Sequence, residues 1–499
     1  MSGQFLLAID QGTSSSRAVI YDHSVKVQAS VQQEFAQIYP QPGWVEHDPE
    51  DIWSSVHAVA RQAMHDLGTT ARELTAIGIT NQRETTLVWH RESGQCVYNA
   101  IVWQDRRTAE ACEKLRSDAA EPVVSAKTGL RLDPYFSATK IAWILDNVAG
   151  ARDLARRGKL AFGTVDSFLL WRLTGGRVHA TDASNASRTL LFNIHKQQWD
   201  DDLLALFDVP RNMLPEVLDC AADFGETDDA TVGGAVPILG IAGDQQAALI
   251  GQAGLRAGVT KSTYGTGCFV IANTGQEALT SQNKLLTTVA SRIAGEVTYG
   301  LEGSVFVAGS AIQWLRDELK IISSASETGP IAESTGVVDD VIVVPAFAGL
   351  GAPYWDPHAR GAILGLTRGS GRNEIVTATL QSIALQTRDL VDAMSDDGVA
   401  PSILRVDGGM VANDWFLQFL ADILNIPVER PKNVESTVLG VAYLAAVQSG
   451  VIKSVSEIES MWQRDVVFEP AMTADRRLAL LSGWAAAVSR VREDKQSHA

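Results

Sequence analysis

A glycine-containing turn near the start of the chain carries the donors that phosphate groups require. In the segment DQGTSSSR, residues 10–17, Gly12 lets the backbone approach a ligand closely. The hydroxyl and N–H groups that can donate to phosphate oxygens belong to Thr13, Ser14 and Ser15. Arg17 adds positive charge, and Asp10 at a strand end can hold a metal ion through water. Taken alone, this segment is equally well explained as a polar hairpin.

Two later stretches repeat the pattern of strand, glycine turn and donor. STYGTG, residues 262–267, offers the hydroxyl of Thr266, and VDGGMVAN, residues 406–413, places Gly409 just before a helix. A glycine pair at a strand–helix junction lets the flat parts of a nucleotide lie against backbone. Each stretch alone is weak evidence, but the three in this order resemble the outline of the actin-like (ribonuclease-H-like) ATPases. The resemblance implies a two-domain α/β fold with the active site in the interdomain cleft.

Other phosphate-binding motifs are absent from the sequence. The chain has no GxxxxGK(S/T) segment, since Lys261 and Ser262 follow Val259 and Thr260 rather than glycine. It has no GxGxxG at a strand–helix junction, and it lacks the HRD and DFG pair of protein kinases. P-loop and protein-kinase folds are therefore poor explanations of the chain.

A second set of side chains has the chemistry to bind a small polyhydroxyl compound. Its members are Arg83, Glu84, Trp103, Tyr135, Asp244, Gln245 and Phe269. Charged, amide and phenol groups can saturate hydroxyls, while the rings of Trp103 and Phe269 can cover a carbon edge. Such a site discriminates strongly, because a wrong ligand leaves buried polar groups unpaired.

Plainer explanations exist for each of these residues. From spacing alone, Arg83 and Glu84 are better explained as an exposed ion pair after a strand. The aromatic residues are typical of a hydrophobic core, and Asp244 is typical of a helix N-cap. Composition and periodicity do not decide between these explanations and a binding site.

Two long stretches resemble the signatures of the FGGY family of carbohydrate kinases, and the similarity extends over nearly the whole chain. One is YFSATKIAWILDN at 135–147, and the other runs from GAILGL at 361–366 to ATLQ at 378–381. The stretches that resemble the glycerol-phosphorylating members are TNQRETT (80–86), WQDRR (103–107), DPYF (133–136) and GDQQ (243–246). Members that act on xylulose usually carry GQMHG where this chain has NQRET, so the resemblance points away from pentuloses.

The resemblance implies in-line transfer of the ATP γ-phosphoryl group to a terminal hydroxyl of glycerol, with Mg²⁺ as cofactor. Asp244 is expected to act as general base, and Asp10 and Asp244 to hold the metal through water. The residues implied in nucleotide binding are Thr13, Ser14, Ser15, Arg17, Thr266, Gly309, Gln313, Gly409 and Asn413. One alternative is a kinase of the same family for another small polyol or ketose. The other is a non-kinase actin-like ATPase, which leaves the polyol set without a role.

Strands and helices must bring these segments together. The apolar runs 5–9 and 17–21 and the alternating run 25–31 predict an antiparallel meander, and a helix follows from the N-cap Asp48 to about Gly68. Further helices are expected at 138–147, 165–173, 310–321, 374–394, 414–424 and 437–448, and further strands at 74–80, 261–271, 341–344 and 403–406. The strand–turn–strand unit at 261–271 suggests an internal repeat.

The 499 residues are too many for one ordinary core, so two domains are expected. Residues 1–250 are expected to carry most of the polyol site and 251–499 most of the nucleotide site. The glycine-spaced stretch 240–258 is interpreted as the hinge region between them.

Composition and charge limit the partners of the chain. With 59 acidic and 42 basic residues, the formal charge is −17, a sign that repels nucleic acid and anionic membranes. The apolar run at 5–9 is too short for a signal peptide or a membrane span, and the four cysteines form no CxxC pair. We therefore expect a cytoplasmic enzyme, and the family resemblance implies a homodimer or homotetramer.

Overall fold

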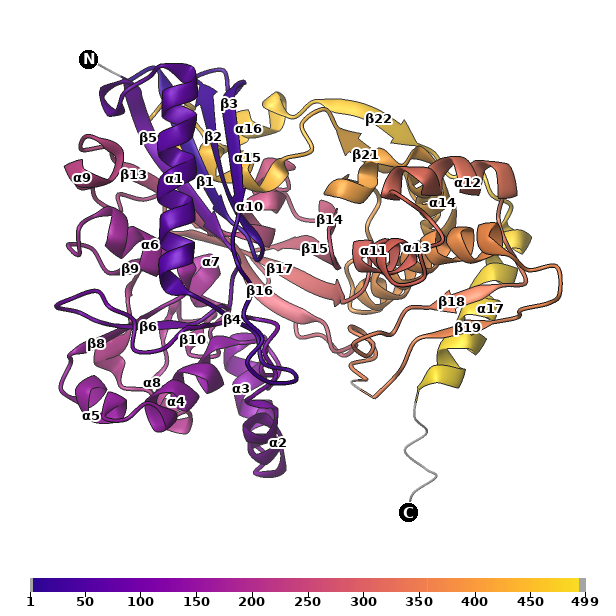
Figure 1. The fold of residues 1–499 in the computed structure, drawn as a ribbon, viewed down its shortest axis with the longest axis horizontal. Coiled ribbons are helices and arrows are strands. Elements are labelled where there is room, and N and C mark those ends of the chain that lie inside the picture. Colours follow the sequence, from indigo (N-terminus) through magenta and orange to yellow (C-terminus); the bar gives the residue numbers. More distant parts are fainter. Residues whose placement is uncertain (1–2, 357, 493–499) are drawn as a thin grey trace.

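The computed structural model describes residues 3–356 and 358–492, which form two lobes (Figure 1). Each lobe is built on one large β-sheet, of five strands in the first lobe and seven in the second. Helices pack against both sheets. The mixed α/β, two-domain architecture expected from the sequence is confirmed.

The first sheet begins with the predicted antiparallel meander. It consists of β1 (Phe5–Gln11), β2 (Ser15–Asp22) and β3 (Val27–Glu34). Two further strands, β5 (Leu74–Asn81) and β13 (Ile238–Gly243), join in parallel, and the strand order is β13-β5-β1-β2-β3. The central strand β1 therefore ends beside β5, which places the first phosphate turn next to the segment that follows β5.

The second sheet repeats this topology. Its meander is β14 (Thr260–Tyr264), β15 (Cys268–Gly275) and β17 (Glu296–Val305), and the parallel strands are β20 (Leu404–Asp407) and β21 (Val428–Pro431). The strands β16 (Leu286–Ile293) and β22 (Arg464–Phe468) extend the two edges. The internal repeat suggested by the sequence is thus present, and the turns after β1 and β14 occupy equivalent places in the two lobes.

Both faces of the first sheet are covered, as the alternation along β1 shows. Leu7 and Ile9 pack with the core that includes α1 (Pro49–Leu67), whereas Leu6 and Ala8 face a second core. Asp48 caps α1 by accepting a hydrogen bond from the N–H of Glu50, as predicted. Successive side chains of a strand point to opposite faces of the sheet, so the apolar run at residues 5–9 needs apolar partners on both faces.

The second core is completed by a helix from the C-terminal part of the chain. Helix α15 (Ser436–Gln448) packs on α10 (Asp244–Gly251) and on β1, β5 and β13. Figure 1 shows α15 and α16 beside the first lobe although their colour places them late in the sequence. The stretch 240–258, interpreted as a hinge, contains the end of β13 and all of α10, so most of it belongs to regular structure.

Most predicted helices are present with small changes at their ends. Those of the second half are α11 (Gly309–Asp317), α13 (Arg372–Asp396), α14 (Asp414–Leu424) and α15, whose range is given above. Helix α11 ends four residues before the predicted position 321, because Lys320 adopts a left-handed backbone conformation with φ 54° that helices do not continue through. In the first half, α4 (Ser137–Asn147) and α6 (Val165–Leu173) match the expected ranges closely.

Shorter elements connect these parts. The strands are β4 (Glu46–His47), β6 (Leu87–His90), β7 (Ala100–Ile101), β8 (Leu160–Gly163), β9 (Ala180–Asp182), β10 (Phe192–Asn193), β11 (Gln198–Trp199), β12 (Glu216–Leu218), β18 (Ile342–Val344) and β19 (Ala362–Leu364). The α-helices are α2 (Ala109–Ser117), α3 (Glu121–Thr128), α5 (Ala151–Arg156), α7 (Ala183–Ala186), α8 (Asp201–Leu206), α9 (Asp229–Val232), α12 (Thr328–Thr335), α16 (Val455–Met461) and α17 (Ala474–Val491). The 3₁₀ turns are η1 (Ala71–Glu73), η2 (Arg211–Met213), η3 (Ala325–Glu327) and η4 (Gly409–Ala412).

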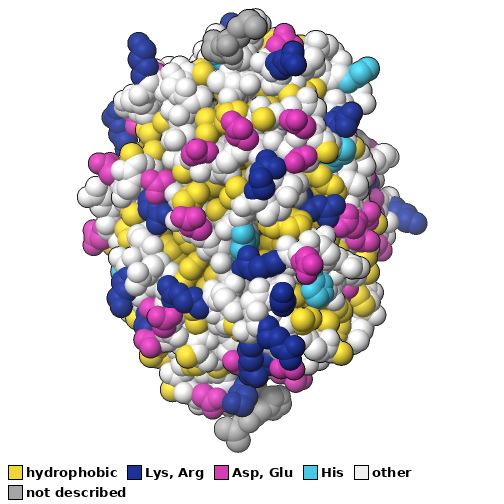
Figure 2. Space-filling model, turned by 90° about the vertical axis from the view of Figure 1, so that its left-hand side faces the viewer, with side chains coloured by type: hydrophobic (Ala, Val, Ile, Leu, Met, Phe, Trp, Pro, Cys, Tyr) yellow, Lys and Arg dark blue, Asp and Glu magenta, His cyan; other side chains and the backbone are white. Residues whose placement is uncertain are grey.

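The surface and the helices carry two further observations. Acidic and basic side chains are interspersed over the face of the first lobe shown in Figure 2, so the net charge of −17 is not gathered into one patch there. Within the ranges that the structure describes, we find no helix with the length and apolarity needed to cross a membrane.

Candidate active site between the two lobes

One cavity of about 320 Å³ brings together residues from four distant parts of the sequence. All seven members of the predicted polyol set line it, together with the predicted phosphate donors Thr13, Ser14 and Thr266. The turns after β1 and β14 both reach this cavity. The repeated sheet topology therefore places donors from the two lobes on opposite sides of one space.

Arg83 and Glu84 follow the buried strand β5, and they are 2% and 1% exposed. The explanation of these two residues as an exposed ion pair is wrong. The reason is that β5 lies between β1 and β13, so the segment leaving it runs into the interior rather than over the surface. Sequence spacing cannot distinguish these two outcomes.

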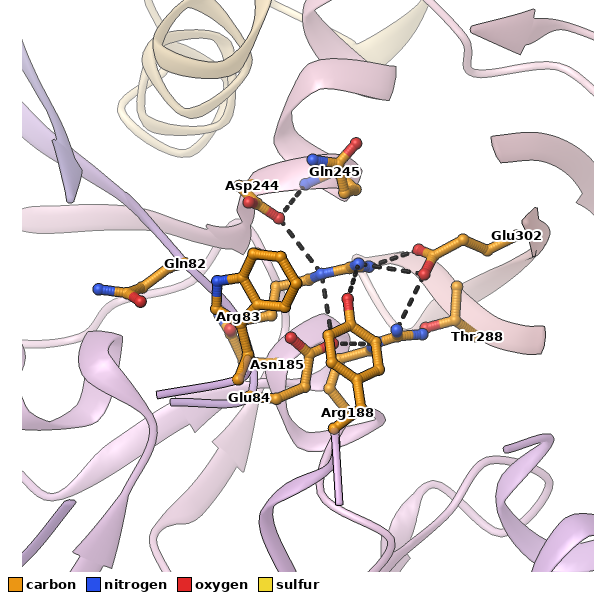
Figure 3. Close-up of polar contacts among 12 residues, drawn as sticks. Gln82, Arg83, Glu84, Asn185, Arg188, Asp244, Gln245, Thr288 and Glu302 are labelled. Atoms are coloured by element: carbon orange, nitrogen blue, oxygen red, sulfur yellow. Dashed lines mark hydrogen bonds and ion pairs between the residues drawn. The ribbon is translucent and has the colours of Figure 1, made fainter. Parts of the chain in front are cut away.

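Two further buried charges close a ring with this pair (Figure 3). The two terminal nitrogens of Arg83, Nη1 and Nη2, donate to the carboxylate of Glu302 at 2.5 and 3.1 Å. Arg188 donates from Nη2 to Glu302 at 2.9 Å and from Nε to Glu84 at 2.7 Å. Although burial opposes ionisation, Arg188 and Arg83 lower the pKa of Glu302 to about 2. For Glu84 burial prevails over the same two arginines, and its pKa is raised.

Asp244 is the first residue of α10, and the helix N-cap is Gly243 rather than Asp244. Its Oδ1 accepts a hydrogen bond from the Gln245 N–H at 2.7 Å and lies 3.2 Å from Arg83 Nε. The side chain is 31% exposed, so it can reach a ligand in the cavity. The neighbouring Gln245 is held by Lys261, whose Nζ donates to its Oε1 at 2.5 Å.

Three aromatic rings form the apolar wall of the cavity. Trp103 packs edge to face against Tyr135 and Phe269, with ring centroids 5.6 and 6.2 Å apart. The indole N–H of Trp103 donates to the hydroxyl of Thr13 at 2.9 Å. These rings are half-buried at the cavity rather than enclosed in a core, and Trp103 connects the polyol set directly to the first phosphate turn.

The other residues predicted to bind nucleotide lie outside the lining of this cavity. Gly309 packs on the carbonyl of Gly265 and near Met410, which brings α11, the second phosphate turn and the Gly409 turn together. Asn413 caps α14 by accepting from the N–H of Phe416. Arg17 pairs with Glu435 and Gln32, and the Ser15 hydroxyl accepts from Gln32. Gln313 lies on α11. A nucleotide role for these five groups and Gly409 stays a prediction.

Asp10 and Asp244 are the carboxylates predicted to hold a metal ion. Burial, and then the charge of Asp244, raise the pKa of Asp10 to about 7. Among the residues described, no three His, Cys, Asp or Glu side chains converge as a complete metal-binding group. Asp10 and Asp244 lie near enough for the charge of Asp244 to raise the pKa of Asp10, and two such carboxylates fit a divalent cation that takes its remaining ligands from phosphate and water.

We expect Asp10→Asn to stabilise the metal-free protein at alkaline pH. The raised pKa means that the stabilising contribution of protonated Asp10 is fully present below about pH 4 and is lost as the pH rises through about 7. At pH 8 in a chelator, the variant should therefore melt about 2–4 °C above wild type, and the gap should narrow as the pH falls and nearly close at about pH 4. Asp48→Asn is the matched control, because asparagine caps a helix equally well. An unchanged melting temperature at pH 8 would contradict the electrostatic strain inferred at Asp10.

Sequence reasoning missed several residues of this site. Lys261, Arg188 and Glu302 are fully buried beside the lining, and Gln37 and Tyr39 line the cavity itself. A signal existed for Lys261 and Glu302, since Lys261 is the one charged residue of β14 and Glu302 is the one charged residue of β17 after Glu296 at its start. Arg188 lies after the short helix α7 and offers no comparable signal.

A duplicated ribonuclease-H-like sheet with facing phosphate turns and a polar pocket between the lobes defines a two-domain phosphotransferase of the actin-like class. Models of the N-terminal and C-terminal domains of the FGGY family of carbohydrate kinases match residues 5–251 and 260–449. The chain belongs to the FGGY family of carbohydrate kinases.

Relatives within the family cover almost the whole chain. A protein of Ectopseudomonas mendocina named glycerol kinase is 61% identical over 492 residues, covering 98% of this chain and 99% of its own length. Glycerol kinase 1 of Pseudomonas aeruginosa is 59% identical, with coverage of 98% and 99%. The crystal structure of Plasmodium falciparum glycerol kinase with ADP superimposes with a TM-score of 0.91 at 36% identity, covering 99% of both chains. A xylulose kinase from Lactobacillus acidophilus, at 21% identity and a TM-score of 0.86, shares the fold.

Proposed function

We propose that this chain transfers the γ-phosphoryl group of ATP to a terminal hydroxyl of glycerol, forming sn-glycerol 3-phosphate and ADP. The observation that carries the proposal is the single cavity that joins the polyol set to the phosphate turns. The names of relatives about 60% identical over nearly the whole chain support the choice of glycerol. A non-kinase ATPase would leave the buried polar set without a purpose.

In the proposed reaction, Asp244 takes the proton from the attacking hydroxyl as the new P–O bond forms. Its Oδ1 is already held by the N–H of Gln245 and faces Arg83 Nε, so the carboxylate is aimed before substrate binds. Arg83, Glu84, Tyr135 and Gln245 would bind the glycerol hydroxyls, and Trp103 and Phe269 would cover the carbon edge. The acceptor is thereby oriented for in-line attack, which is the main requirement of phosphoryl transfer.

The phosphates of ATP would lie between the two glycine turns. Thr13 and Ser14 from the first lobe and Thr266 from the second lobe offer hydroxyl donors at the cavity. Asp10 and Asp244 would hold Mg²⁺ through water, and the ion supplies charge neutralisation for the phosphates. Ser15, Arg17, Gly309, Gln313, Gly409 and Asn413 complete the predicted nucleotide set. A cytoplasmic location and a homodimer or homotetramer also stay predictions.

The test is ADP release from purified protein with Mg-ATP, measured with and without glycerol. We expect release to depend strongly on glycerol and the product to be glycerol 3-phosphate, because an oriented acceptor hydroxyl reacts far faster than a water molecule that the site does not position. A panel of other small polyols and ketoses at the same ATP concentration separates glycerol from the alternative substrates. Slow ADP release that ignores every acceptor would overturn the proposal and favour a non-kinase ATPase.

A further inference from the structure

Two buried charges beside the cavity have no part in the proposed reaction. Arg188 and Glu302 are both 0% exposed, and neither lines the cavity. Glu302 lies on β17 of the second lobe, whereas Arg188 follows α7 of the first. Both nevertheless contact residues of the polyol set, which places them one layer behind it.

The contacts of Glu302 and Arg188 show which side chains these two charges orient (Figure 3). Glu302 accepts from both terminal nitrogens of Arg83, and such a bidentate pair fixes the plane of a guanidinium group. With both Nη atoms engaged, the Nε edge of Arg83 faces Asp244 at 3.2 Å and Glu84 at 3.5 Å. Arg188 holds the Glu84 carboxylate from the other side at 2.7 Å. Glu302 and Arg188, which do not line the cavity, therefore help to set the orientations of Arg83 and Glu84.

Arg188 also contacts the aromatic wall. Its guanidinium lies 5.7 Å from the ring centroid of Tyr135 and 5.3 Å from that of Phe136. Tyr135 in turn accepts from Arg83 Nη2 at 3.2 Å through its hydroxyl. Arg188 thus supports Glu84 and Tyr135 together, two residues proposed to bind the acceptor.

A purely structural role does not explain this ring well. Buried ion pairs are costly to desolvate, and apolar side chains of the same volume often serve stability equally well. Within the part of the chain that the structure describes, Arg188 Nη1 is a buried donor without a hydrogen-bond partner, which adds to the cost. An arrangement that stabilises little but fixes two site residues indicates a positioning role.

We propose that Glu302 and Arg188 are positioning residues that hold Arg83 and Glu84 in the orientation that binds the acceptor. The inference rests on the proposed function. Because Glu302 comes from the second lobe and Arg83 and Glu84 from the first, acceptor affinity also depends on the contact between the lobes. The nucleotide site, which uses other residues, does not depend on this ring.

The experiment compares Glu302→Gln with the double variant Arg188→Gln/Glu302→Gln. The single variant leaves one net positive charge in the ring, whereas the double variant removes one charge of each sign and stays balanced. We expect the KM for glycerol to rise about tenfold or more in the single variant and at least about fivefold in the double variant. The KM for ATP should change less than about twofold in both.

The KM values for glycerol and for ATP distinguish a positioning role of Glu302 and Arg188 from a role in stability alone. A variant that merely folds less well loses active molecules, which lowers kcat and leaves both KM values unchanged. Asp389→Asn is the matched control, since this carboxylate accepts from Tyr354 and Trp484 in the second lobe, away from the cavity lining. It should leave the KM for glycerol and the KM for ATP unchanged, whatever its effect on the melting temperature.

The possible outcomes are distinct. A wild-type KM for glycerol in the balanced double variant would overturn the positioning role, as would failure of that variant to fold, which would show that the ring serves the fold. Equal rises in the KM for glycerol and for ATP would also overturn it. Wild-type protein whose ADP release ignores glycerol would overturn the proposed function itself, and with it this inference.

Discussion

Replacement of Asp244 by asparagine is expected to lower turnover by about 10²–10⁴-fold while changing glycerol binding only modestly. The geometry explains why the loss is confined to chemistry. Asp244 Oδ1 accepts from the Gln245 N–H and faces Arg83 Nε, and the side-chain oxygen of asparagine can keep both contacts. The ability to accept a proton disappears, and with it the negative charge that would help to hold Mg²⁺, while the contacts that orient the side chain remain.

The measurement is single-turnover kinetics together with calorimetric binding of glycerol in the presence of ADP. Asp48→Asn serves as control, because it makes the same chemical change at a helix cap away from the cavity. Turnover close to wild type in Asp244→Asn would refute its assignment as general base. A loss of glycerol binding as large as the loss of turnover would instead assign Asp244 to ground-state binding.

Replacement of Gly440 by alanine is expected to destabilise the protein by about 3 kcal/mol, the upper end of the usual cost of overpacking. A Cβ at this position of α15 would lie 1.8 Å from the carbonyl oxygen of Ala247 in α10, so one helix must move. The atom in the way is a backbone oxygen of a helix, which cannot move aside as the end of a flexible side chain can. Because α10 begins with Asp244, the displacement should also reduce activity in the molecules that remain folded.

Thermal and denaturant unfolding test this expectation, and Gly483→Ala is the matched control. Gly483 also lies in a helix, α17, but a Cβ there would meet only the terminal methyl of Ile342, at 3.3 Å. The control should be neutral or slightly stabilising, by up to about 1 kcal/mol, because alanine favours helix over glycine. If both variants unfold alike, the contact between α10 and α15 is looser than the structure indicates.

Much of the architecture could be read from local patterns. The meander of β1 to β3, the capped helix α1 and the second strand–turn–strand unit all follow from periodicity and turn chemistry, which act over a few residues. The end of α11 and the regular structure within residues 240–258 were predicted less well, since a local conformation at Lys320 and contacts of α10 with distant strands decide them.

The seven residues of the polyol set and the phosphate turns were identified from their chemical types and from resemblance to a family. Whether these residues share a site depends on the distances between them in the folded protein, and their spacing along the sequence does not give those distances. Arg83 and Glu84 illustrate the limit, because their spacing favours an exposed pair and their position between β1 and β13 buries them.

The sequence by itself determined the fold class, the family and the kinds of side chain available for chemistry, because these depend on residue type and short-range order. Only the tertiary structure decided that Glu302 contacts Arg83, which is 219 positions away in the sequence. It also decided that Arg188 binds both Glu84 and Glu302. The reason is physical: a buried charge must be paired, and its partner is whichever opposite charge the packed strands bring within reach.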